Sequence, residues 1–144
     1  MRKVLIGFAW IVVAMAAATG HSARAQTAKN VSAQDCASAA TQARMNECAY
    51  EDFLAATAGY AASYKAISDK LAGRQRDQFR RTQKRWIQYR TAGCNFESSG
   101  VQGGSAQGMV KWRCDTRMTR VRTAELEKWA SCQEGDLNCL RFGK

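Results

Sequence analysis

Apolar and aromatic side chains recur at helical spacing along much of this chain, which contains no proline. From residue 45 to residue 71 they fall on one face of a 3.6-residue repeat. The members of this face are Met45, Cys48, Phe53 with Asp52 beside it, Ala56, Tyr60, Tyr64, Ile67 and Leu71. No stretch alternates convincingly with the period of two that marks a strand. The pattern therefore predicts an all-α fold whose first long helix spans residues 41–72 and stops at Gly73.

Two more helices are predicted, over residues 75–96 and 106–131. One face of the second helix carries Phe79, Gln83, Trp86, Arg90 and Cys94, with Tyr89 beside it. A plain core face would carry leucine and isoleucine, so this face is chemically mixed. We expect Trp86 and Tyr89 to pack in the core rather than to form a binding platform. We expect Arg90 to bury its stem and to bind a helix end or a carboxylate, rather than an external ligand.

A glycine-rich segment separates the second and third helices. Residues 97–108 (ESSGVQGGSAQG) contain four glycines, three serines and a single large apolar residue, Val101. This composition is typical of a loop, and loops of this length are often functional. Three helices joined by a turn at Gly73 and by this loop predict a small three-helix antiparallel bundle.

The first 25 residues have the composition of a secretory signal peptide. Residues 2 and 3 are cations, residues 4–18 carry no charge, and residues 23–25 (Ala-Arg-Ala) match the small-x-small pattern of signal-peptidase cleavage. A retained membrane anchor is the alternative, but the apolar stretch ends at Gly20, short of the about 20 apolar residues that a span needs. No cysteine follows the cleavage site directly, so no lipid anchor is expected. The prediction is a periplasmic or secreted protein that does not span a membrane, with a removed segment over residues 1–25 and an N-terminal arm over residues 26–40.

All six cysteines lie after residue 25, whereas the only histidine, His21, lies before it. An even number of cysteines in a small exported chain predicts three disulfides that staple the bundle. A metal site is the alternative, but the chain has no C-x-x-C pair and no histidine ligand after cleavage. We therefore expect no metal and no cofactor.

The pairing of the cysteines is guessed from position. The last two are close in sequence and would close the C-terminal tail, residues 132–144. An antiparallel pair of helices around Gly73 would place Cys48 and Cys94 at the same end. The predicted pairs are Cys36–Cys114, Cys48–Cys94 and Cys132–Cys139.

Four short motifs occur along the chain: TQARMNECA (41–49), QKRWIQYRTAGC (83–94), the Gly-Gly-Ser of residues 103–105, and CDTRMTRVRTAEL (114–126). As a set they resemble the LprI-like lysozyme-inhibitor family of small secreted bacterial proteins, over residues 36–129. The resemblance implies an LprI-like helical domain over residues 41–131 and a lysozyme as protein partner. The motif residues that we interpret as structural rather than functional are Asn46, Glu47, Trp86, Tyr89, Arg90, Thr119, Arg120 and Arg122.

The resemblance also bears on the start of the first helix. Family members often have an acidic residue where this chain has Arg44, and an acid there would complete a capping box from Thr41. The box is broken here. The helix start is therefore expected to be weaker, or to lie earlier, near Ser38.

Catalysis has little support in the residues. Without a histidine after cleavage, Ser–His, Cys–His and His–zinc sites are absent. Carboxylate pairs remain at Glu47 with Glu51 and at Glu125 with Glu127, but a glycosidase-like site needs a cleft, of which a small bundle offers little. We expect the first pair to neutralise arginines of the neighbouring helices, the candidates being Arg90, Arg117 and Arg120. The chain is predicted not to be an enzyme.

An inhibitor can insert a loop into the lysozyme cleft and present hydrogen-bond donors or a cation to the catalytic carboxylates. Residues 98–107 are the best candidate, because glycine permits close backbone approach and a disulfide at the base would limit the entropy lost on docking. The predicted inhibitory residues are Ser98, Ser99, Gln102, Gly103, Gly104, Ser105, Lys111 and Arg113. The formal net charge of +10 falls to +7 when the three cations of residues 1–25 are removed. Such a chain would be repelled at long range by a basic lysozyme.

The strongest charge feature is a basic face on the second helix. Residues 74–90 contain seven cations and one acid, Asp77. The residues assigned to this basic face are Arg80, Arg81, Lys84 and Arg85. Outside the cytoplasm its partners would be lipid headgroups, anionic cell-wall polymers or an acidic protein cleft, whereas nucleic acid fits the charge but not the compartment. Two alternatives to inhibition follow: a non-enzymatic binding module for anionic envelope surfaces, and a structural envelope protein in which this face only aids solubility.

Overall fold

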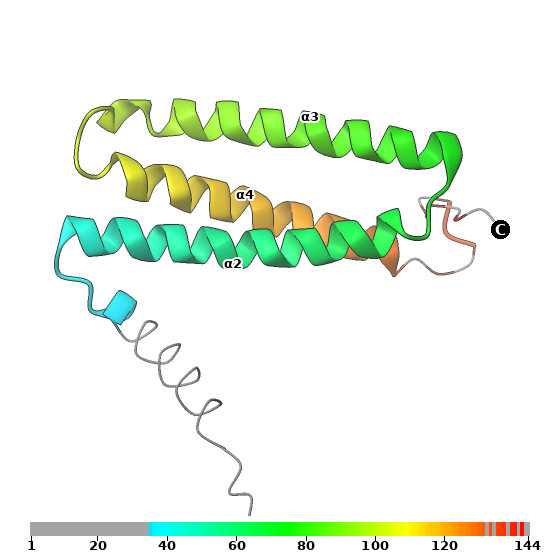
Figure 1. The fold of residues 1–144 in the computed structure, drawn as a ribbon, viewed down its shortest axis with the longest axis horizontal. Helices are drawn as coiled ribbons and strands as arrows, with labels where there is room; N and C mark the ends of the chain where they lie inside the picture. Colours follow the sequence, from blue (N-terminus) through cyan, green and yellow to red (C-terminus); the bar gives the residue numbers. More distant parts are fainter. Residues whose placement is uncertain (1–34, 132, 134, 138, 141, 143–144) are drawn as a thin grey trace, which may run out of the picture. The chain divides into compact units, whose positions relative to one another are not determined.

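The computed structural model describes residues 35–131, 133, 135–137, 139, 140 and 142. The described part contains three long helices, α2 (Gln42–Ser68), α3 (Gly73–Glu97) and α4 (Gln107–Ala130), and one 3-10 turn, η1 (Ser99–Val101). Successive helices run antiparallel, and α4 returns beside both α2 and α3 (Figure 1). The all-α, three-helix antiparallel bundle is thus confirmed. None of the described helices combines the length and the apolar character that a membrane span requires.

Thr41 begins α2. Its backbone is extended, with φ −114° and ψ 148°, and its Oγ1 accepts a hydrogen bond from the Arg44 backbone N–H at 3.2 Å. This single bond is half of a capping box. The helix therefore begins at Gln42, one residue after the predicted start at residue 41. The expectation of an earlier start near Ser38 is wrong, because residues 39–40 are not helical and separate α2 from a short helical turn at residues 35–37.

The turn between α2 and α3 begins earlier than predicted. α2 ends at Ser68, and the connection continues with backbone bonds from Lys70 to the Ile67 carbonyl at 3.0 Å and from Leu71 to the Ser68 carbonyl at 3.3 Å. Leu71 is buried, so the connection also closes this end of the core. Gly73 has φ +47°, which favours glycine, but it opens α3 instead of stopping α2.

Small residues line the contact between α2 and α4. Ala49, Ala56 and Ser63 recur at seven-residue spacing on one buried face of α2. A Cβ added to Gly59 would lie 4.0 Å from the Thr123 methyl group of α4. Small side chains allow two helix backbones to approach, so α4 lies closer to α2 than α3 does.

Aromatic rings fill the space between α2 and α3. Tyr60 stacks on Trp86, and Tyr64 stacks on Phe79, each pair with ring centroids 5.2 Å apart. The buried core cluster consists of Tyr60, Ile67, Leu71, Phe79 and Leu126. The partly buried residues that pack against it are Tyr64, Trp86, Trp129, Ala130, Leu140 and Phe142. The apolar core therefore lies toward the α2–α3 turn, where residues of the C-terminal tail also pack.

The two described disulfides differ from the predicted pairing. Cys36 is bonded to Cys48, with Cα atoms 5.6 Å apart, and Cys94 is bonded to Cys114, with Cα atoms 5.5 Å apart. The predicted Cys48–Cys94 and Cys36–Cys114 bridges are wrong. The prediction treated α2 and α3 as the closest neighbours, whereas aromatic rings hold these two helices apart and the start of α4 lies against the end of α3.

Some predictions fall on residues that the structure does not describe. The signal peptide over residues 1–25 and most of the arm over residues 26–40 lie outside the described residues. Cys139 belongs to a disulfide. The predicted Cys132–Cys139 pair involves Cys132, which also lies outside them.

Candidate functional site

Asp115, in the first half of α4, is a carboxylate held between two cations. Only 2% of its surface is exposed. Its Oδ2 lies 2.6 Å from Lys111 Nζ, and its Oδ1 forms an ion pair with Arg90 Nε at 3.3 Å. Thr119 donates its hydroxyl to the Asp115 backbone carbonyl at 2.6 Å and accepts a bond from Arg90 Nη1 at 2.9 Å. A buried charge is tolerated when it is paired in this way, and the cluster ties α3 to α4.

Two arginines alternate with aromatic rings through the bundle. The guanidinium carbon of Arg90 lies 5.1 Å from the Phe53 ring centre and 5.3 Å from the Trp86 ring centre. The guanidinium carbon of Arg122 lies 5.9 Å from the Trp86 centre and 4.8 Å from the Trp129 centre. A cation over an aromatic face contributes on the order of 0.5–2 kcal/mol. This stack joins α2, α3 and α4, and it accounts for the mixed chemistry of the inward face of α3.

Sequence reasoning missed Asp115, and it named Arg122 only as a motif residue without its buried contacts. Both are buried and polar, so a search for apolar periodicity passed over them. Their helical spacing could have indicated that they are buried. One face of α4 carries residues three or four positions apart: Asp115, Thr119, Arg122 and Leu126.

Two expectations about side chains are wrong. Tyr89 is 67% exposed and does not pack in the core. It is the residue before the inward-facing Arg90, and consecutive helical residues point about 100° apart. Glu47 and Glu51 form ion pairs with Arg44 of their own helix, at 3.0 and 3.3 Å. The hydrogen bond to Glu47 is the largest effect that raises the pKa of Arg44. The ion pairs of the three arginines that were expected to bind them are Arg90–Asp115, Arg117–Glu97 and Arg120–Asp52.

Residues 98–106 form the connection between α3 and α4, which we call the α3–α4 loop. Consecutive backbone turns cover it, including η1 and a bond from the Val101 N–H to the Ser98 carbonyl at 3.2 Å. Gly103 has φ +75°, and its N–H donates to Gln107 Oε1 at 2.9 Å. The disulfide between α3 and α4 closes the base of the loop. The glycine-rich segment is therefore a shaped loop that is shorter than the predicted one.

Asn46 of α2 reaches across to this loop. Its Nδ2 donates to the Ser105 carbonyl at 2.9 Å, and its Oδ1 accepts from the Met109 N–H at 2.9 Å. Met109 lies in the first turn of α4, and Ala106, at the N-cap position of that helix, offers no side-chain cap. Asn46 thus supplies an N-terminal cap from another helix and holds the loop against α2.

The predicted inhibitory residues divide into two groups. Ser98 is 1% exposed and donates to the Asn95 carbonyl at 3.2 Å, and Lys111 is bound to Asp115, so both are engaged within the protein. The exposed members are Ser99, Gln102, Gly103, Gly104, Ser105 and Arg113. The side chains of Ser99, Gln102 and Arg113 have no hydrogen-bond or ion-pair partner among the described residues.

The basic face lies on the exposed surface of α3. Its four members, Arg80, Arg81, Lys84 and Arg85, are exposed, and none forms an ion pair within the described part of the chain. Arg90, which the sequence places in the same basic stretch, turns inward to Asp115 instead. The basic face and the α3–α4 loop are therefore separate features of the surface.

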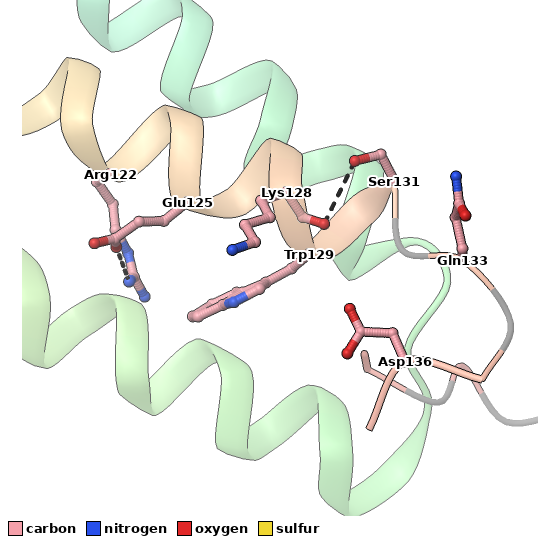
Figure 2. A pocket seen from close by; sticks show the side chains of 7 residues that line it. All are labelled: Arg122, Glu125, Lys128, Trp129, Ser131, Gln133 and Asp136. Atoms are coloured by element: carbon pink, nitrogen blue, oxygen red, sulfur yellow. Dashed lines mark hydrogen bonds and ion pairs between the residues drawn. The ribbon is translucent and has the colours of Figure 1, made fainter. Parts of the chain in front are cut away.

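A cavity of about 850 Å³ lies at the C-terminal end of α4. Its lining residues are Arg122, Glu125, Lys128, Trp129, Ser131, Gln133 and Asp136. Figure 2 shows the Trp129 ring between the Arg122–Glu125 pair on one side and Asp136 on the other. Arg122 Nη1 donates to Glu125 Oε2 at 2.6 Å. Among the described residues, two cations and two carboxylates line this cavity, and no residue of it was among the predicted site residues.

Comparisons with known proteins agree with the resemblance of the motifs. The family model described as "Lysozyme inhibitor LprI" matches residues 32–126. The chain is also 31% identical over 107 residues to the uncharacterized protein R02472 of Rhizobium meliloti (strain 1021), covering 65% of this chain and 77% of that protein. No solved structure matches the chain.

Proposed function

This chain belongs to the LprI lysozyme-inhibitor family, and from this premise we propose that it binds a peptidoglycan-cleaving lysozyme and blocks it with the α3–α4 loop. The main support for the proposal is that this loop is held in a fixed shape while its tip is exposed to solvent. A disulfide, backbone turns and Asn46 hold its shape, while its tip is exposed. A loop ordered before binding loses less entropy when it docks.

The chemistry of the tip suits an enzyme cleft that holds catalytic carboxylates. Ser99 and Gln102 supply hydrogen-bond donors without a partner among the described residues, and glycines at positions 100, 103 and 104 permit close backbone approach. Arg113, two turns into α4, is the available cation, whereas Lys111 is bound to Asp115. The protein would act outside the cytoplasm, by stoichiometric occupation of the cleft and without catalysis of its own.

Peptidoglycan lysis by lysozymes of different types, titrated with the oxidised protein, tests the proposal. We expect stoichiometric loss of lysis for one type. Gly100→Tyr should then weaken inhibition about 100-fold or more, because a ring at the loop tip blocks docking. A Cβ added to Gly100 meets no atom within 4 Å, so the variant should keep the fold.

Ala58→Tyr is the matched control, since it adds the same ring at an exposed position in the middle of α2. It should inhibit as well as the unchanged protein, provided that both variants show unaltered helical circular dichroism. If the oxidised protein inhibits no lysozyme type, or if Gly100→Tyr inhibits normally, the loop proposal is wrong.

The exposed and unpaired basic face supports a second candidate function, the binding of anionic envelope polymers or lipid headgroups. Reversal of the four charges of this face should release the protein from anionic vesicles and leave inhibition unchanged. Loss of inhibition in that variant, with vesicle binding retained, would assign the face to the inhibitor function instead.

A further inference from the structure

A groove of about 480 Å³ runs between α2 and α3. Its lining residues are Tyr60, Tyr64, Arg80, Gln83, Lys84, Ile87 and Gln88. The floor is built of stacked rings, since Tyr60 packs on Trp86 and Tyr64 packs on Phe79. A packed aromatic floor does not have to reorganise on binding, and the volume lies in the range of about 300–1,000 Å³ that small-molecule sites occupy.

The groove has cations beside its apolar floor. Arg80 and Lys84 lie four residues apart on α3, so their side chains leave the helix on the same face. Both are exposed, and neither forms an ion pair with a described residue. Ile87, one turn further along, is 40% exposed and extends the apolar surface away from these charges. The groove therefore has an apolar part and a cationic part.

Gln83 adds a hydrogen-bond donor. Its Oε1 accepts from Arg122 Nε at 3.1 Å. An arginine can only donate, so the oxygen must face Arg122 and the amide nitrogen must point elsewhere. That Nε2 is buried, and it has no acceptor in the part of the chain that the structure describes, although Gln83 lines the groove. Gln83 therefore gives the groove a polar position beside its apolar floor.

We propose that this groove binds a single-chain anionic amphiphile, with its hydrocarbon chain on the Tyr60, Tyr64 and Ile87 surface and its carboxylate at Arg80 and Lys84. A small inorganic anion would leave the apolar floor uncovered. A neutral chain would leave the two cations without a counter-charge. The groove is separate from the α3–α4 loop, so this inference does not depend on lysozyme inhibition.

Calorimetric titration of the oxidised protein with dodecanoate, below its micelle concentration, tests the proposal. Acetate carries the same head without the chain, and dodecyl maltoside carries the same chain on a neutral head. We expect 1:1 binding of dodecanoate that is at least about tenfold tighter than that of either control, because only dodecanoate uses both parts of the groove.

Two double charge reversals on α3 provide the matched comparison. Arg80→Glu with Lys84→Glu changes two residues that line the groove, whereas Arg81→Glu with Arg85→Glu makes the same change of net charge outside its lining. The first pair should weaken dodecanoate binding at least about tenfold, and the second should change it less than about twofold. Chemical-shift changes on binding should include the backbone amides of Tyr64 and Ile87.

Three results would overturn the proposal: equal affinity for dodecanoate and dodecyl maltoside, equal weakening by the two double reversals, or shift changes that avoid both amides. Equal weakening would indicate a general attraction of anions to the basic face. Gly100→Tyr should bind dodecanoate normally, which keeps this test independent of the loop proposal.

Discussion

The Asp115 carboxylate is buried and forms ion pairs with two cations. Its partners come from its own helix and from α3, at 2.6 Å for Lys111 and 3.3 Å for Arg90. Removing one partner of a buried ion pair leaves the other charge without compensation, which costs more than the pair contributed. Exposed pairs such as Arg117–Glu97 lack this asymmetry, because water replaces the lost partner.

Asp115→Asn should therefore lower the free energy of unfolding by about 3 kcal/mol or more. The amide keeps the shape of the side chain but cannot neutralise Arg90, which is 13% exposed. Urea unfolding followed by circular dichroism measures the change. Glu97→Gln is the control, and the loss of this exposed pair should cost less than about 1 kcal/mol. Equal losses in the free energy of unfolding for the two substitutions would mean that the burial of Asp115 does not strengthen the effect of losing its charge.

Among the elements, α4 depends on α2 at its start. The helix has no acidic residue in its first turn and no side-chain cap of its own. Asn46 supplies the missing acceptor to the Met109 N–H, and the same side chain holds the Ser105 carbonyl of the loop. A Cβ added to Gly108 would lie 3.4 Å from Asn46 Cγ, so this contact is close. One side chain of α2 therefore contributes both to the order of the loop and to the start of α4.

Asn46→Ala should destabilise the protein by about 0.5–2 kcal/mol, the range expected for loss of a helix cap. The more specific effect is local, because the Met109 N–H loses its acceptor. Hydrogen exchange at Met109 and in the α3–α4 loop should accelerate. Asn95→Ala, at an exposed position on α3, should leave exchange at these sites unchanged. Unchanged protection at Met109 in Asn46→Ala would show that α4 does not need this cap.

At the scale of the whole molecule, the net positive charge should control the rate at which the protein associates with a charged partner. The formal net charge is +10, and the unpaired basic face concentrates part of it on one side of α3. Long-range repulsion between two basic proteins acts over about 30 Å at 0.01 M salt but only about 8 Å at 0.15 M. The contact proposed for the α3–α4 loop is short-ranged, so salt should affect association more than the bound complex.

The rate of association with a basic lysozyme should therefore rise as salt increases from about 0.01 to 0.15 M. With an acidic lysozyme the rate should fall. Stopped-flow fluorescence at several salt concentrations measures both rates, and the dissociation rates serve as an internal control, since they should change little. A rate that falls with salt for a basic enzyme would place an acidic contact surface on this protein.

The helices themselves were predictable from residues close in sequence. Helical spacing located all three, Thr41 marked the start of the first, and the inward face of α3 was correctly placed from Phe79 to Cys94. The order of the α3–α4 loop was not predictable, because the acceptors and donors that hold it include Asn46, which is about 60 residues away in sequence. Glycine content alone indicated only a loop.

Local chemistry thus determined the elements of this protein, because helix periodicity and capping depend on residues within a few positions of one another. The tertiary structure alone decided the pairing of the cysteines, the burial of Asp115 and Arg122, and the groove between α2 and α3. Each of these depends on which helix lies next to which. Small residues brought α4 close to α2, and aromatic rings held α3 apart, so contacts between distant residues shaped the α3–α4 loop and the groove.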